Sequence, residues 1–97
     1  MLGALITSCG NNQQGNDKEQ LISQACGYLD KAWKIRGFYT PKYEAMKVEN
    51  YTKAGSSFRE LAAIDSGFIP FASVIQKDGS ISNFTKFYEM IDFCGLS

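Results

Sequence analysis

The sequence of 97 residues contains no histidine. This absence removes the most common general base, the usual partner of serine and cysteine nucleophiles, and the most common metal ligand. A glycine-rich phosphate-binding motif is missing too. The carboxylates are scattered along the chain, without a spacing that pairs them for acid–base catalysis. We therefore expect a protein that is not an enzyme and that holds neither a metal nor an organic cofactor.

Long apolar runs and an excess of one charge are also absent. No run approaches the roughly 18 residues of a membrane-spanning helix. The 10 Lys and Arg residues balance the 10 Asp and Glu residues, so the net charge favours neither nucleic acid nor an anionic membrane. Hydrophobic residues make up 44% of the chain, which is enough for the core of one small domain.

The N-terminal segment carries the most specific motif. Residues 5–9 read Leu-Ile-Thr-Ser-Cys: two aliphatic residues, two small ones and a cysteine. This pattern resembles the lipobox of bacterial lipoproteins, and residues 1–8 resemble the end of a signal peptide whose basic beginning is missing. The resemblance implies that Cys9 becomes an acylated N-terminus. Residues 9–16, polar after the cysteine, would then be a flexible tether, and residues 17–97 a single helical domain.

The same resemblance implies a location. The protein would be held in a bacterial membrane by its lipid anchor and would face the periplasm. Gly10 stands where enteric bacteria use Asp for inner-membrane retention, which is compatible with an outer-membrane destination. With Cys9 lipidated, Cys26 and Cys94 remain as an even pair in an oxidising compartment, which predicts a disulfide between them. The alternative is two buried thiols in a reducing cytoplasm.

Helical periodicity is clearest between residues 17 and 34. The apolar residues of this segment recur at helical spacing: Leu21, Ile22, Ala25, Cys26, Leu29, Ala32 and Trp33. Asp17 is placed to cap its start, and Gly37 to end it. A second helix should begin at Pro41 and run to about residue 53.

The second half of the chain allows more than one interpretation. Ser57 and Glu60 form a capping box, so a third helix should run to about Asp65, unless it merges with the second. Residues 68–78 fit a short helix, although Asp78-Gly79 also fits the turn of a β-hairpin. Ser82 is placed to cap a last helix. The predicted fold is an all-α bundle of four to five short helices, with an optional β-hairpin near residues 71–84.

Basic and aromatic residues gather in the middle of the chain. Residues 31–59 hold seven Lys and Arg against two Glu, interleaved with aromatic side chains. Such an alternation suits a protein partner, for which Tyr, Trp and Arg are favoured contacts, an anionic membrane surface, or a nucleic-acid strand. The alternative is that the basic residues are solvated flanks of amphipathic helices whose aromatic residues belong to the core. The eight residues predicted to bind a partner, here called the basic-aromatic set, are Lys34, Arg36, Tyr39, Lys42, Tyr43, Lys47, Tyr51 and Lys53.

These observations lead to two hypotheses. The first is a non-enzymatic accessory lipoprotein of the bacterial cell envelope, whose basic-aromatic set binds a protein of an envelope complex. Nucleic acid would rarely be met in that compartment. The second is a soluble cytoplasmic module that binds nucleic acid or protein and keeps its cysteines reduced.

Overall fold

The protein folds as an all-α domain, as the sequence predicts. The computed structural model describes the backbone of residues 3–96 and the side chains from Asp17 onward. The helices are α1 (Gly3–Lys34), α2 (Pro41–Ile64), the 3₁₀ turn η1 (Ser66–Phe68), α3 (Ile69–Ala72) and α4 (Phe84–Phe93). In the described part of the chain, no helix is long and apolar enough to span a bilayer.

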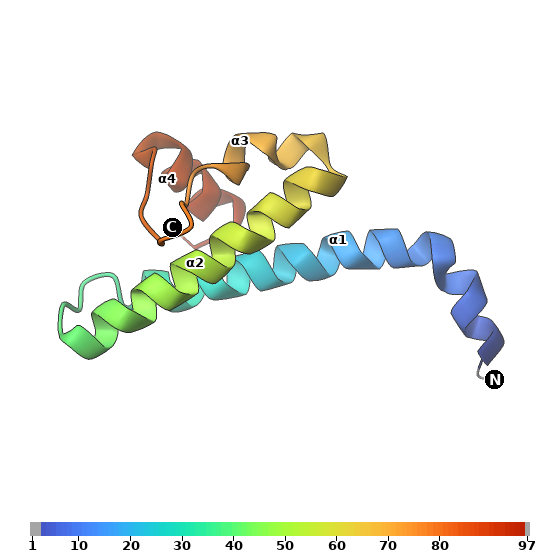
Figure 1. The fold of residues 1–97 in the computed structure, drawn as a ribbon, viewed down its shortest axis with the longest axis horizontal. Coiled ribbons are helices and arrows are strands. Elements are labelled where there is room, and N and C mark those ends of the chain that lie inside the picture. Colours follow the sequence, from blue (N-terminus) through green and yellow to red (C-terminus); the bar gives the residue numbers. More distant parts are fainter. Residues whose placement is uncertain (1–2, 97) are drawn as a thin grey trace.

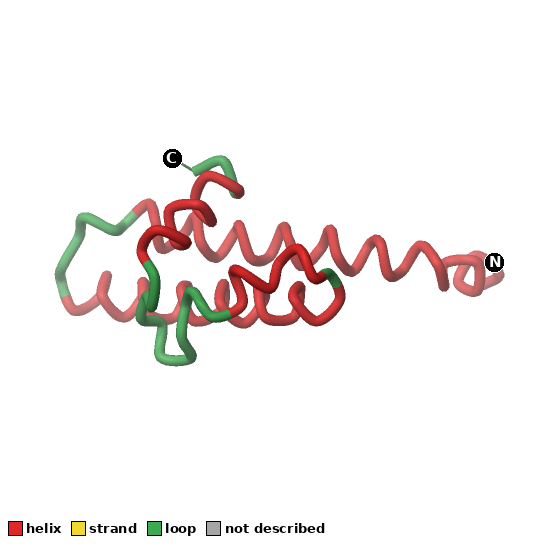
Figure 2. Tube along the Cα trace, turned by 90° about the horizontal axis from the view of Figure 1, so that it is seen from above, coloured by secondary structure: helices red, strands yellow, loops and turns green. Residues whose placement is uncertain are grey.

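Two long antiparallel helices form the frame of the domain. Helices α1 and α2 lie side by side and are joined by the loop of residues 35–40, while α3 packs against α2 and α4 packs against α3 (Figures 1 and 2). The N-terminal part of α1 extends past the end of α2 (Figure 1). The largest fully buried side chains come from α1, α2, α4 and the α3–α4 loop: Leu29, Phe58, Leu61, Val74, Ile75, Met90 and Ile91.

Helix α1 is longer than the periodicity predicts. It includes residues 17–34 as expected, but Asp17 does not cap its start, because the helix continues back to Gly3. The segment expected to be a flexible tether is therefore helical in its backbone. This segment consists mostly of Asn, Gln and Gly and contains no proline, which would interrupt the helical hydrogen bonds. The side chain of Cys9 lies outside the described residues, so its lipidation stays a prediction.

The second and third predicted helices are one continuous helix. Thr40 caps α2 as its side chain accepts a hydrogen bond from the Tyr43 amide, and Pro41 opens the helix as predicted. The capping-box interpretation of Ser57 is wrong, because Ser57 is buried within α2. Gly55 does not break the helix either. It lets the backbone of the α3–α4 loop approach, since a Cβ there would lie 2.9 Å from the Ile75 carbonyl oxygen.

Residues 66–82 combine the two alternatives left open by the sequence. The segment begins with η1 and the single turn of α3, and continues into a tight loop. Ile75 and Ile81 form an isolated antiparallel bridge across this loop, so the hairpin is reduced to one bridging pair. Gly79 takes a positive φ of 87° in the turn, a conformation that favours glycine.

The last helix is attached to the first by a covalent bond. Helix α4 is capped by the Asn83 side chain, which accepts from the Lys86 amide, and not by Ser82. Cys94, directly after α4, forms the predicted disulfide with Cys26 of α1, with their Cα atoms 5.4 Å apart. The bond joins residues that are 68 positions apart and ties α4 to α1.

Asp65 joins the N-terminal and middle parts of the domain through an ion pair that predicts acid sensitivity. The Lys18 ammonium, 2.6 Å away, and the Gly67 amide hold the pKa of the Asp65 carboxyl below its ordinary value of 3.8. Because the folded-state pKa is lowered, the carboxylate stabilises the fold above the ordinary value, and this stabilisation is lost as the pH falls through the lowered pKa. Urea unfolding should therefore show that the free energy of unfolding falls less between pH 6 and pH 3 for Asp65→Asn than for wild type. An equal loss would contradict the assignment, and Asp92→Asn is the control for an exposed carboxylate.

Candidate functional site

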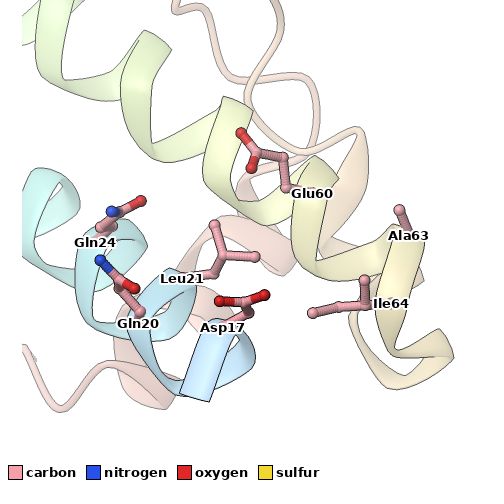
Figure 3. A pocket seen from close by; sticks show the side chains of 7 residues that line it. All are labelled: Asp17, Gln20, Leu21, Gln24, Glu60, Ala63 and Ile64. Atoms are coloured by element: carbon pink, nitrogen blue, oxygen red, sulfur yellow. The ribbon is translucent and has the colours of Figure 1, made fainter. Parts of the chain in front are cut away.

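Two hollows on the surface are large enough to hold a ligand. One lies between α1 and α2 near Asp17, has a volume of about 470 Å³, and is drawn in Figure 3. Asp17 and Glu60 face this hollow from opposite helices, with Leu21 and Ile64 as its apolar lining (Figure 3). Within the part of the chain that the structure describes, no three acidic, cysteine or histidine residues group as metal ligands. None of the basic-aromatic set lines this hollow.

The second hollow is an open groove of about 730 Å³ formed by the end of α1, the first half of α2 and the start of α4. We call it the aromatic groove. Its lining residues are Trp33, Arg36, Gly37, Tyr39, Glu44, Lys47, Val48, Tyr51, Gly79, Ile81, Phe84, Phe87 and Tyr88. Three of its aromatic side chains remain more than half exposed: Tyr39 at 75%, Phe84 at 60% and Tyr88 at 55%. Exposed rings in one groove are typical of a binding surface.

The structure brings half of the basic-aromatic set into the aromatic groove. Arg36, Tyr39, Lys47 and Tyr51 line it. Lys34 and Lys53 lie outside it and are paired, with Asp30 at 3.1 Å and with Glu49 at 3.0 Å. Tyr43 packs against the Phe38 ring, with centroids 5.1 Å apart, and the Lys42 ammonium lies 6.0 Å from the Tyr43 ring centroid.

Lys47 supports the groove from within. Its residue surface is only 8% exposed, and its ammonium donates to the Glu44 carboxylate at 3.1 Å and to the Arg36 carbonyl at 3.4 Å. It also lies 4.5 Å from the centroid of the Tyr39 ring. Lys47 therefore ties the α1–α2 loop to α2, and charge reversal there would disturb the loop as well as any binding.

Arg36 is arranged differently. Its guanidinium stacks on the indole of Trp33, 4.0 Å from the ring centroid, and donates to the Trp33 carbonyl at 2.8 Å. Within the described part of the chain, no carboxylate lies within 4.0 Å of it. A guanidinium has five N–H donors in a fixed fork, so most of the Arg36 donors are left for a ligand.

Tyr51 closes one side of the groove. Its ring packs edge-on against Phe87, with centroids 5.8 Å apart. Burial raises the pKa of the Tyr51 phenol above its ordinary value of 10.0, against an opposing effect of the Arg36 charge. The hydroxyl is therefore protonated at neutral pH and is able to donate a hydrogen bond.

Sequence reasoning missed the contribution of α4 to the site. Phe84 and Tyr88 are four residues apart and lie on one side of that helix, and Phe87 packs against both of their rings and against Trp33. In the sequence, the spacing of Phe84 and Tyr88 places them on an apolar stripe of a helix, and such a stripe normally indicates core. Their exposure at the groove depends on where α4 docks, and that is not encoded in the stripe itself.

Comparison of the chain with protein-family models, with curated proteins and with solved structures finds no match. The site must therefore be interpreted from its own geometry and charge.

Proposed function

We propose that this protein is a non-enzymatic binding protein of the bacterial cell envelope, anchored by lipid at Cys9, that holds a protein partner in the aromatic groove. The observation that carries the proposal is the convergence of exposed aromatic rings and the Arg36 guanidinium in one open groove. Tyr, Trp and Arg are the residues that most often dominate the energy of protein–protein contacts. Their grouping favours binding over catalysis.

The envelope location is supported by two independent features. Residues 5–9 resemble a lipobox, and a disulfide such as Cys26–Cys94 persists in an oxidising compartment. The geometry of α1 suits an anchored receptor. At the helical rise of 1.5 Å per residue, Trp33 lies about 36 Å from Cys9 along α1. An anchor at one end would thus leave the groove at the other end free to meet a partner.

Site-specific photo-crosslinking of the full chain in its native cells tests the proposal. A photoreactive residue replacing Phe84 or Tyr88 should form a crosslink to the same protein, whereas one replacing Ile69 should not. Ile69 is a matched position, because it is 58% exposed but lies outside the aromatic groove. Crosslinks of equal yield from all three positions would contradict the groove as the binding site.

The anchor has its own test. The intact mass of the protein recovered from native cells should correspond to a chain that begins at an acylated Cys9 and gains two hydrogens on reduction. Cys9→Ser should lose the acyl mass and leave the membrane fraction. An unmodified chain that begins at Met1 would remove the anchor and the envelope location from the proposal.

A further inference from the structure

The cations of the aromatic groove already cover two of its ring faces. The Arg36 guanidinium stacks on Trp33 at 4.0 Å, and the Lys47 ammonium lies over Tyr39 at 4.5 Å. A ring face attracts a cation through its quadrupole, but these faces are taken by side chains of the protein itself. An incoming cationic group would therefore meet like charge, whereas an anionic group would meet opposite charge.

The two cations differ in the charge that they leave for a ligand. Lys47 is neutralised locally by Glu44, with which it forms a 3.1 Å ion pair. Arg36 makes one side-chain hydrogen bond, to a neutral carbonyl, and is exposed. A guanidinium edge matches the two oxygens of a carboxylate and forms the stronger, charge-assisted type of hydrogen bond. The groove therefore offers one defined position for a carboxylate, at Arg36.

Apolar surface surrounds that position. Val48 is 50% exposed on the α2 side, and Phe84 and Tyr88 face the groove from α4. Burying such side chains against an apolar group contributes roughly 25 cal/mol per Å² of surface removed from water. A ligand that carries an apolar side chain next to its carboxylate would use both features at once.

The charge balance disfavours a nucleic-acid strand. The groove lining holds two cations, Arg36 and Lys47, against the carboxylate of Glu44. Strand binding commonly neutralises several phosphates along a continuous positive groove. Lys34 and Lys53 do not extend this positive charge, because they lie outside the groove in ion pairs. One uncompensated guanidinium suits a peptide carboxylate better than a run of phosphates.

We infer that the partner segment bound in the aromatic groove is an acidic peptide, with an Asp or Glu carboxylate on Arg36 and an adjacent aromatic or aliphatic side chain against Val48, Phe84 and Tyr88. This inference rests on the proposed function and specifies the chemistry of its partner.

Trp33 provides the measurement. It is the single tryptophan of the chain and forms part of the groove, so its emission reports occupancy. The probe is a short blocked peptide of alternating Glu and Phe, titrated into the full chain. It should produce a saturable change in emission, and peptides of alternating Lys and Phe or of Glu and Ala should bind about tenfold more weakly or worse. Oligothymidylate is the nucleic-acid probe.

Two matched pairs of variants locate the binding. Arg36→Gln should weaken binding of the Glu–Phe peptide about tenfold, whereas Lys77→Gln, which removes a cation outside the groove, should leave it unchanged. Phe84→Ala should weaken binding, and Ile69→Ala, at a similarly exposed position, should not. Each variant is compared with its own unliganded emission, and circular dichroism checks that it is folded.

Three results would overturn the inference: equal binding of the Lys–Phe peptide, tighter binding of oligothymidylate with strong salt dependence, or no change of emission with the Glu–Phe peptide. If the acidic peptide fails while crosslinks from Phe84 and Tyr88 still identify one protein, the groove remains the binding site and only its charge preference is wrong. If the crosslinks fail as well, the proposed function is wrong with it.

Discussion

Reduction of the Cys26–Cys94 disulfide is expected to lower the free energy of unfolding by roughly 4 kcal/mol. The bond closes a loop spanning 68 positions, and closing a loop of that length removes a large part of the conformational freedom of the unfolded chain. Domains of this size have little other stability to lose. Urea unfolding with and without a reductant, followed by Trp33 emission, measures the difference.

The disulfide also affects the aromatic groove. Helix α4 supplies Phe84 and Tyr88 to the groove, and its far end is tied to α1 by Cys94. The remaining contacts of α4 with Trp33 are aromatic, through Phe87 and Tyr88 at centroid distances of 5.9 and 6.2 Å. We therefore expect the Cys26→Ser and Cys94→Ser variants to lose binding as well as stability.

The control for this experiment is Cys9→Ser. It changes the third cysteine but leaves the Cys26–Cys94 bond, so it should keep the unfolding midpoint of the oxidised protein and the same response to reductant. Coincident unfolding curves for oxidised and reduced wild type would show that the bond does not stabilise the fold.

Gly55→Ala is expected to destabilise the domain by about 1–2 kcal/mol, although helix propensity alone predicts a gain of about 1 kcal/mol. A Cβ at this position would lie 2.9 Å from the Ile75 carbonyl oxygen and 3.0 Å from the Ile75 Cβ. The loop has little freedom to retreat. Ile75 is fully buried, and its carbonyl accepts a 2.9 Å hydrogen bond from the Arg59 guanidinium.

Gly27 offers a matched control within the other long helix. A Cβ added there would meet no side chain or distant backbone atom within 4 Å. Gly27→Ala should therefore stabilise the domain by about 0.5–1 kcal/mol. The two substitutions should thus change the urea midpoint in opposite directions. A gain of stability in both would mean that the loop does not approach α2 as closely as described.

The sequence by itself determined the local features of this protein. The apolar stripe of residues 21–33 specified a helix, and Pro41 specified the start of another, because helical periodicity and the geometry of proline act over a few neighbouring residues. Once the lipobox resemblance assigned Cys9 to lipid, the two remaining cysteines predicted the pair Cys26 and Cys94, an argument that needs no knowledge of packing.

Only the tertiary structure decided how the remaining residues are used. Gly55 falls between the second and third predicted helices, but it lies inside α2, and its missing side chain serves the contact with Ile75, a residue twenty positions away. Lys47 belongs to the set predicted to bind a partner, and its burial between α2 and the preceding loop could not be predicted from the sequence. The aromatic groove could not be predicted for the same reason. Arg36 and Phe84 line one groove only when α4 docks beside α1, and such docking depends on contacts between distant parts of the chain.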